Sequence, residues 1–482
     1  MSRILYLGNM LRNKKISCVE LTDEYLNAAK KNNPELNAYI MFTGELALKK
    51  ACEVDEKLLG SDDLSPLSGI PFILKDNIAT MGIKTTCASK MLSNHIPVYD
   101  ATVWECLKEQ DAVLIGKGNL DEMSMGSDGS TSYFGQILNP CDVSRIPGGS
   151  SGGTAAAVGA GTAVFGIGTD TGGSIRQPAS YCGLVGLKPT YGAVSRYGLF
   201  ALSSSLDTIG PITTSVKDAA IVFDAISKYD KRDMRSVGSL PMTSSLTDNI
   251  RGMRIGVVRE FFKIASNDVV NAVNNALKIL EDRGAVITDI EFPLMKYSLA
   301  AYHIISRAEA ASNFGRFDGI RFGYRPEKYS DVDDLIKKSR SEGFGSEVKR
   351  RLITGTYLLS SDYINVYYKK AIEYKNALIN EYKKLFQDYD CIITPTEPST
   401  AMKINSNECS ENNYDDICLT SVNIAGIPAV TVPCGFDADG LPIGFQVIGD
   451  KFCESKILSA ALAFETETDG CFIYKSESGV AL

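Results

Sequence analysis

The stretch RIPGGSSGGTAAAVGAG, from Arg145 to Gly161, joins a loop rich in glycine and serine to a run of alanines. Because glycine disfavours helix and alanine favours it, a helix is expected to begin near Gly152. A second stretch of this kind, GTDTGGSIRQP, runs from Gly168 to Pro178. Ser150 lies 24 positions before Ser174, a spacing that fits one helix and one strand folding the two loops together.

Helical and strand patterns alternate along most of the chain, which is typical of α/β proteins. GIPFILKDNI (Gly69–Ile78) reads as a short buried strand with the polar Lys75 at its end. The candidates for loops or insertions are the polar stretches 228–249, 325–345 and 403–415. None of these reads as a linker, so we expect a single domain over residues 1–482 with surface insertions.

The composition is that of an ordinary globular protein, with 44% hydrophobic and 22% charged residues in a chain of 482. The net charge of −8 argues against a broad nucleic-acid-binding face. The twelve cysteines form no C-x-x-C pair, and the sequence shows no secretory leader and no apolar run long enough to span a membrane. We therefore expect a cytoplasmic protein with reduced thiols.

Phosphate binding is the first alternative for the two glycine-rich loops. A Walker A motif requires G-x-x-x-x-G-K-[ST], and no segment supplies it. The dinucleotide pattern G-x-G-x-x-G begins at Gly166 but has Thr171 in its last position. The sequence therefore does not favour nucleotide binding by this chain.

A serine nucleophile is the second alternative, because Gly148-x-Ser150-x-Gly152 satisfies the pattern G-x-S-x-G. A nucleophile elbow follows a strand, however, and the preceding NPCDVSRIP reads as a loop. The base would have to be His303, which lies in a helical pattern. A lysine whose pKa is lowered by burial can also act as the base, and Lys75 fits that role because it follows the apolar GIPFIL.

The same stretches carry a family resemblance. GGSSGGTAAAVGAG and GIGTDTGGSIRQPASYCGLVGLKPTYGAVSRYG resemble the signature region of the amidase signature family, and GIPFILKDNI resembles its lysine segment. SSLDTIGPIT, FDGIRFGYR and NIAGIPAVTVPCG extend the similarity over nearly the whole chain. FDGIRFGYR and KPTYGAVSRYG are particularly similar to the glutamine-hydrolysing subunits of tRNA-dependent amidotransferases. The resemblance implies the amidase signature fold, a large mixed β-sheet covered by helices on both faces.

The resemblance also implies a Ser-cisSer-Lys triad, with Ser174 as nucleophile, Ser150 as bridging serine and Lys75 as base. Lys75 in its neutral form would accept a proton from Ser150 while Ser150 accepts one from Ser174. In the family the peptide bond before the bridging serine is cis, which here is the bond Gly149–Ser150.

Residues around the nucleophile are expected to assist the reaction. Fixed backbone N–H groups can stabilise the oxyanion, and the expected donors are Thr171, Gly172 and Gly173. The residues expected to support the two loops are Ser151, Asp170 and Arg176. Two plainer roles stay open at this point: Ser151 as a helix cap, and Asp170 with Arg176 as a surface ion pair.

A glutamine substrate needs an anion for its α-ammonium group and a cation for its α-carboxylate. Asp416 matches the family position for the ammonium contact, and Arg351 in EVKRRLI is the better match for the carboxylate, with Arg350 beside it. Arginines at a helix end are also often merely solvated. The segment from Thr394 to Asp416 departs from the family pattern, with Glu397 in place of an alanine, which leaves the choice of substrate open.

The implied function is glutamine hydrolysis, with ammonia passed to a partner subunit that converts Glu-tRNA(Gln) to Gln-tRNA(Gln) or Asp-tRNA(Asn) to Asn-tRNA(Asn). Because the chain shows no ATP loop and no basic RNA face, B- and C-type subunits of a heterotrimer are expected to bind ATP, Mg²⁺ and tRNA. We expect no cofactor, metal or membrane contact in the chain itself. The alternative is a free-standing amidase that hydrolyses other small carboxamides.

Overall fold

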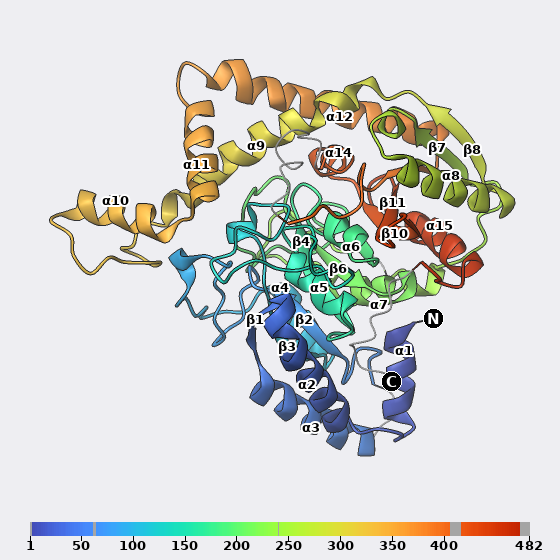
Figure 1. The fold of residues 1–482 in the computed structure, drawn as a ribbon, viewed down its shortest axis with the longest axis horizontal. Helices are drawn as coiled ribbons and strands as arrows, with labels where there is room; N and C mark the ends of the chain where they lie inside the picture. The colour runs from blue at the N-terminus through green and yellow to red at the C-terminus, as the bar shows by residue number, and fades with distance from the viewer. Residues whose placement is uncertain (1, 61–63, 240, 405–415, 473–482) are drawn as a thin grey trace.

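The computed structural model describes residues 2–60, 64–239, 241–404 and 416–472 (Figure 1). Within these ranges a sheet of eleven strands runs through the molecule in the order β1-β3-β2-β4-β6-β5-β10-β11-β9-β7-β8. The strands are β1 (Tyr39–Phe42), β2 (Pro71–Lys75), β3 (Val113–Gly118), β4 (Phe165–Asp170), β5 (Val185–Lys188), β6 (Thr208–Thr213), β7 (Arg254–Val258), β8 (Val286–Ile290), β9 (Cys391–Pro395), β10 (Ala429–Phe436) and β11 (Pro442–Ile448).

The sheet is mixed, as the family resemblance predicts. Strand β2 pairs in parallel with β3 and β4, whereas β6 pairs antiparallel with both β4 and β5. Strands β10 and β11 form an antiparallel hairpin, and β7 runs parallel to β8 and β9. Strands from both halves of the chain therefore form one sheet, and β4, which leads into the second glycine-rich loop, shares this sheet with the C-terminal strands β9, β10 and β11.

Helices cover the sheet on both faces (Figure 1). They are α1 (Arg3–Arg12), α2 (Cys18–Leu36), α3 (Gly44–Gly60), α4 (Thr102–Glu109), α5 (Gly152–Gly159), α6 (Arg176–Tyr181), α7 (Val216–Ile226), α8 (Asn267–Asp282), α9 (Ser298–Asn313), α10 (Val332–Gly343), α11 (Ser346–Leu358), α12 (Lys369–Asp388), α14 (Thr420–Ala425) and α15 (Glu454–Glu467). Helix α15 packs on α7, α8 and the β10–β11 hairpin, while α5 packs on α2, α6, β2 and β4. Helices α9, α11 and α12 lie together on the side opposite α2 and α3.

Helix α5 begins at Gly152, where the sequence predicts it, and is buried along its whole length. Its small residues allow close packing: a Cβ atom on Gly153 would lie 2.5 Å from the carbonyl oxygens of Ala38 and Asn119. The chain between Ser150 and Ser174 forms α5 and then β4, which confirms the predicted order of one helix and one strand.

One predicted loop is in large part a helix. The stretch 325–345 contains α10, which begins after Asp331, and the Asp331 side chain accepts a hydrogen bond from the backbone N–H of Asp334. Figure 1 shows α10 at the outer edge of the molecule, away from the sheet. The segment is polar because α10 buries few of its side chains, among them Leu335. Helices without a broad apolar face are difficult to identify from the sequence pattern.

The fold brings Lys75 and Asp170 to the same edge of the sheet. Lys75 is the last residue of β2 and Asp170 the last residue of β4, and the two strands are parallel neighbours. Carboxyl ends of neighbouring parallel strands meet at one edge, where α/β proteins commonly place their sites. The antiparallel β6 begins at that edge, with Thr208 opposite Asp170.

Candidate active site

Lys75 is the centre of a buried cluster of hydroxyl groups. Its side chain is fully buried, and its Nζ lies 2.8 Å from Ser150 Oγ, 2.9 Å from Ser151 Oγ and 2.9 Å from Thr169 Oγ1. Burial lowers the pKa of Lys75 to about 7, although the charges of buried carboxylates, Asp121 first among them, oppose that shift. Near neutral pH a large fraction of this amine is therefore neutral.

The hydrogen bonds around Lys75 suit a neutral amine, which has two N–H donors and one lone pair. Ser151 Oγ donates to the carbonyl oxygen of Thr169 over 3.1 Å, so it accepts one N–H of Lys75. Thr169 Oγ1 also accepts from Asn77 Nδ2 over 3.0 Å. When Thr169 accepts the second N–H of Lys75, the lone pair is left to face Ser150. This arrangement allows Lys75 to take the proton of Ser150.

The loop of Ser150 has the backbone form that the family resemblance implies, with a cis peptide bond between Gly149 and Ser150. The Gly149 N–H donates to Gln177 Oε1 over 3.0 Å, and a Cβ atom on Gly149 would lie 2.1 Å from the carboxylate of Asp121. Ser151 occupies the N-cap position of α5, but its side chain makes no capping hydrogen bond. The Ser151 hydroxyl therefore serves the Lys75 cluster rather than the helix.

Ser174 lies in the loop between β4 and α6, and it is partly exposed. Its carbonyl oxygen accepts a hydrogen bond from the Ser151 N–H over 3.2 Å, so the two glycine-rich loops are joined directly. The Ser174 hydroxyl makes no hydrogen bond to another described residue. It is thus the solvent-accessible member of a set whose other members, Lys75 and Ser150, are buried.

Asp170 and Arg176 form a buried ion pair rather than a surface one. Arg176 Nε and one terminal nitrogen lie 3.0 and 3.1 Å from the two carboxylate oxygens of Asp170. Burial opposes the ionisation of Asp170, but the charge and hydrogen bonds of Arg176 outweigh it and lower the pKa of Asp170 to about 2. Arg176 also donates to Asn423 Oδ1 and Gln446 Oε1, so α14 and β11 help to fix the loop of Ser174.

The backbone amides of the Ser174 loop differ in their availability. The Gly173 N–H donates to Asp170 over 2.8 Å, whereas the N–H groups of Thr171 and Gly172 donate to no described residue. Gly173 has a φ of 136°, and a Cβ atom there would lie 2.4 Å from the side chain of Leu419. Of the three expected oxyanion donors, Thr171 and Gly172 are therefore the ones with amides left for a ligand.

Asp416 lies beside the Ser174 loop. A Cβ atom on Gly173 would be 3.1 Å from Asp416 Oδ1, so the two positions are in contact. Arg351 lies on α11, where its Nε donates to Glu347 over 2.7 Å, and most of its side chain is covered. Arg350 pairs with the same glutamate and is more exposed, with 57% of its side chain accessible against 19% for Arg351.

Tyr302 connects these groups, although no sequence motif points to it. Its ring packs on Gly172, where a Cβ atom would lie 2.4 Å from Tyr302 Cζ. Burial raises the pKa of Tyr302, the charge of Asp416 raises it further, and the charge of Arg351 opposes the shift. The phenol hydroxyl therefore lies within electrostatic range of both expected substrate-binding residues. In the sequence Tyr302 stands inside the helical pattern AAYHIIS, where nothing distinguishes it from a packing residue.

The surroundings of Arg351 are rich in positive charge. Arg307 is half-buried, and its Nε has no hydrogen-bond partner among the described residues. Burial, followed by the charges of Arg307 and Arg351, lowers the pKa of His303 to about 3. His303 is thus neutral and lies on α9, as the helical pattern predicts, and the cationic surroundings suit a carboxylate ligand.

The described residues bring together no group of three His, Cys, Asp or Glu side chains that could hold a metal ion. Among the described helices, none combines the length and the apolar character that crossing a bilayer requires. The described cysteines are all free thiols.

The sequence profile of the Amidase family matches residues 20–458. The chain belongs to this family. Among its relatives, the A-type subunit of the glutamyl-tRNA(Gln) amidotransferase of Thermoanaerobacter pseudethanolicus is 50% identical over 464 residues, which cover 95% of each protein. The second A-type subunit of the corresponding amidotransferase of Clostridium acetobutylicum is 47% identical over 467 residues, covering 96% of this chain and 98% of the relative.

Solved structures of other amidases have the same fold. The crystal structure of the A-type subunit of the glutamyl-tRNA(Gln) amidotransferase from Thermotoga maritima aligns with a TM-score of 0.76 and 39% identity over 94% of each chain. A peptide amidase from Stenotrophomonas maltophilia aligns with a TM-score of 0.81 and 29% identity, covering 97% of this chain and 96% of that one. The chain is therefore an enzyme of the amidase and amidotransferase class.

Proposed function

We propose that this amidase is the glutaminase subunit of a tRNA-dependent amidotransferase. The observation that carries the chemistry is the buried Lys75 amine 2.8 Å from the Ser150 hydroxyl, next to the loop that presents Ser174. The assignment to the amidotransferase rests on relatives that are A-type subunits of such enzymes and match nearly the whole chain at about half identity.

In the proposed reaction Ser174 Oγ attacks the side-chain carboxamide carbon of glutamine. Ser150 takes the proton of Ser174 while Lys75 takes the proton of Ser150, and the N–H groups of Thr171 and Gly172 stabilise the oxyanion. The C–N bond then breaks, and ammonia leaves with a proton returned through the same relay. Water hydrolyses the resulting ester, which releases glutamate and restores the Ser174 hydroxyl.

Glutamine recognition is assigned to the groups around Tyr302. Asp416 contacts the loop of Ser174 and would bind the α-ammonium group, while Arg351 and its cationic neighbours would bind the α-carboxylate. The Tyr302 hydroxyl would lie between the two ends of the amino-acid head group. Besides burial, the charge of Asp416 raises the pKa of Tyr302, and the charge of Arg351 lowers it, which supports placing the two residues in one subsite.

The other half of the reaction belongs to partners in this proposal. B- and C-type subunits would complete a heterotrimer, bind ATP and Mg²⁺, and amidate Glu-tRNA(Gln) or Asp-tRNA(Asn) with the ammonia released here. The acidic balance of the chain, with 58 Asp and Glu against 50 Lys and Arg, supports leaving the tRNA to those partners. We place the complex in the cytoplasm, where aminoacyl-tRNA is made and used.

A free-standing amidase is the second candidate, favoured by the similarity in fold to a peptide amidase at 29% identity. The departures from the family pattern between Thr394 and Asp416 also bear on substrate choice. Residues 405–415 of that segment lie outside the described residues, whereas residues 394–404 and Asp416 are described, and Glu397, the residue that departs from the pattern, is buried.

The proposed function is tested by mixing the full chain with candidate B- and C-type subunits from the same organism, ATP, Mg²⁺, glutamine and Glu-tRNA(Gln) or Asp-tRNA(Asn). We expect amidated tRNA to form only when this chain is present, with one ammonia used for each glutamine hydrolysed. Efficient hydrolysis of unrelated amides by the chain alone, without transfer to tRNA in the mixture, would instead support the free-standing amidase.

The substitution Asp416→Ala is expected to raise KM for glutamine about 10- to 100-fold with a smaller change in kcat, because it removes the counter-charge of the α-ammonium group. Steady-state ammonia release at varied glutamine concentration measures both constants. Asp282→Ala, which removes an exposed carboxylate on α8, is the control and should leave KM unchanged. An unchanged KM in the Asp416 variant would move the ammonium subsite elsewhere.

A further inference from the structure

Asp207 is a buried carboxylate next to the Ser174 loop that the reaction described above does not use. Asp207 directly precedes β6, and Thr171 directly follows β4. Because the first residue of β6 pairs with the last residue of β4, Asp207 and Thr171 lie beside each other at the edge of the sheet. Thr171 Oγ1 donates to Asp207 Oδ1 over 2.7 Å, and the Ser203 N–H donates to Asp207 Oδ2 over 3.0 Å. Both oxygens of the carboxylate are thus occupied, one of them by the loop of the nucleophile.

This carboxylate forms no ion pair with a described residue. Only 3% of Asp207 is exposed, and burial raises its pKa to about 7, although its two hydrogen bonds oppose that shift. Asp170, the carboxylate at the end of β4 that precedes the Ser174 loop, is by contrast paired with Arg176. A buried carboxylate without an ion pair is costly, and a purely structural acceptor for a threonine could be an uncharged side chain.

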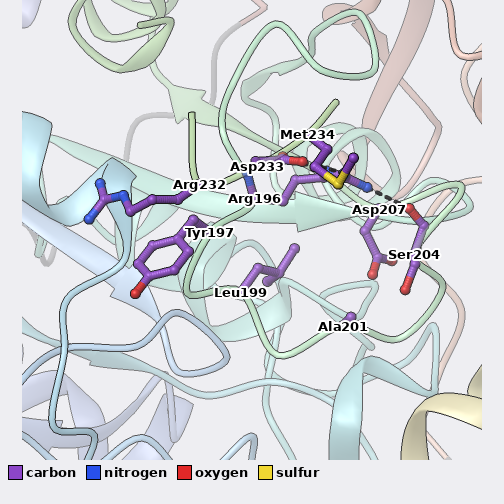
Figure 2. Close-up of a pocket in the computed structure, with 9 residues that line it drawn as sticks. All are labelled: Arg196, Tyr197, Leu199, Ala201, Ser204, Asp207, Arg232, Asp233 and Met234. Carbon is purple, nitrogen blue, oxygen red and sulfur yellow. Dashed lines mark hydrogen bonds and ion pairs between the residues drawn. The ribbon is translucent and has the colours of Figure 1, made fainter. Parts of the chain in front are cut away.

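Arg196 lies in the same region but does not pair with Asp207. Figure 2 shows a pocket of about 210 Å³ with Asp207 and Ser204 at one end and Tyr197 and Arg232 at the other. Arg196, in the wall of this pocket, directs two of its nitrogens to Asp233 over 2.8 and 3.0 Å and another to the Ser204 carbonyl oxygen. The guanidinium of Arg196 therefore holds the loop before β6 in place without forming an ion pair with Asp207.

The segment that carries Asp207 is fixed from a second side. Ser203 Oγ donates to Glu309 Oε2 over 2.7 Å, and the Ser205 N–H donates to the same oxygen over 2.9 Å. Glu309 lies on α9, the helix that also carries Tyr302 against Gly172. The segment before Asp207 is therefore fixed to α9 through Glu309, and the Asp207 carboxylate accepts the hydrogen bond from Thr171.

We propose that Asp207 is a positioning residue, which holds the Thr171 hydroxyl and so fixes the backbone of Thr171 and Gly172 in the form that binds the oxyanion. The inference rests on the proposed attack of Ser174 on a carboxamide. It predicts that the Asp207–Thr171 hydrogen bond matters in the transition state and little in substrate binding, because Asp416, Tyr302 and Arg351 are not part of it.

The test compares Asp207→Asn, Thr171→Val and the double variant in the full chain. Asparagine can accept from Thr171 or from the Ser203 N–H, but not from both, and valine removes the hydroxyl while keeping the branched shape. We expect each single variant to lower kcat about tenfold or more with KM changed less than about twofold. The double variant should be no slower than the slower of the two single variants, because both changes remove one interaction.

Asp218→Asn is the matched control. Asp218 is also fully buried, accepts hydrogen bonds from the N–H groups of Arg3 and Ile4, and follows the opposite end of β6. The Asp218→Asn change should lower the melting temperature by about as much as Asp207→Asn does, and it should leave kcat unchanged. Wild-type kcat in Asp207→Asn and Thr171→Val, losses that multiply in the double variant, or an equal loss of kcat in Asp218→Asn would each overturn the inference.

Transfer of the acyl group to hydroxylamine is measured with glutamine and with a small primary amide, so that the inference and the proposed function fail separately. A wild-type chain that uses the amide but not glutamine contradicts the proposed function, while the variants still test Asp207. A wild-type chain active on glutamine with unaffected variants overturns the inference alone.

Discussion

Replacement of Ser174 by alanine is expected to lower the rate of ammonia release from glutamine by about 10⁴-fold or more. Ser174 is the partly exposed hydroxyl in the set, and in the proposed reaction the buried Lys75 and Ser150 relay its proton. Without the nucleophile no acyl-enzyme forms, and the remaining rate comes from bound water and the oxyanion donors. Steady-state ammonia release measures the loss, and intact-mass spectrometry after rapid quenching measures the acyl-enzyme.

Ser180→Ala is the control for this change. Ser180 is a buried serine on α6, the helix that follows the Ser174 loop, and its hydroxyl takes no part in the Lys75 cluster. This variant should keep both the activity and the acyl-enzyme. If Ser174→Ala retained either of them, the nucleophile would have to be another residue and the proposed chemistry would be wrong.

Replacement of Lys75 by methionine is expected to lower kcat by about 10³-fold, because the relay then lacks a base. In the proposed reaction the neutral amine is the active form, so the rate should depend on the pKa of about 7 that burial gives Lys75. Below that pKa, kcat/KM should rise about tenfold for each pH unit, and above it the rate should level off. The pH profile of glutamine hydrolysis between about pH 5 and 9 measures this dependence.

Lys188 offers a matched control for Lys75. It is also fully buried, and burial lowers its pKa to about 7, but its Nζ donates to the carbonyl oxygen of Pro189 rather than to a serine. Lys188→Met therefore removes an equivalent amine and should lower stability while keeping most of the activity and the pH profile. A flat profile in the wild-type chain, or equal losses in the two variants, would contradict the role given to Lys75.

Much of the fold could be predicted from local patterns. The alanines after Gly152 specify α5, and the apolar run before Lys75 specifies β2, because each pattern is strong over its own short length. The pairing of distant strands is not local: β5 lies between β6 and β10, and only tertiary contacts decide this order. The sheet as a whole was therefore predictable only through the family resemblance.

The residues of the candidate site also fall into two groups, those that the sequence identifies and those that only the structure identifies. Lys75, Ser150 and Ser174 lie in distinctive motifs, so the sequence alone is enough to predict them as site residues. Tyr302 lies in an ordinary helical pattern, and Asp207 lies in SSLDTIGPIT, a stretch that belongs to the family resemblance but gives this residue no role. Only the packing of Tyr302 on Gly172 and the hydrogen bond of Asp207 to Thr171 point to what they do. The difference is physical. A motif reflects the backbone conformation of its own short segment, whereas a contact between distant segments places no constraint on the residues adjacent in sequence.

The hydrogen-bond partners of Arg176 determine when during synthesis the Ser174 loop can reach its final form. Lys75, Ser150 and Ser174 are all synthesised within the first two-fifths of the chain, but Asn423 and Gln446, which accept hydrogen bonds from Arg176, are synthesised near its end. Until β11 joins the sheet, the loop of Ser174 lacks part of the framework that shapes it. We therefore expect a nascent chain to carry the three residues of the proposed triad for most of its synthesis before the hydrogen bonds that shape the Ser174 loop are complete, and to gain activity only when the chain is nearly finished.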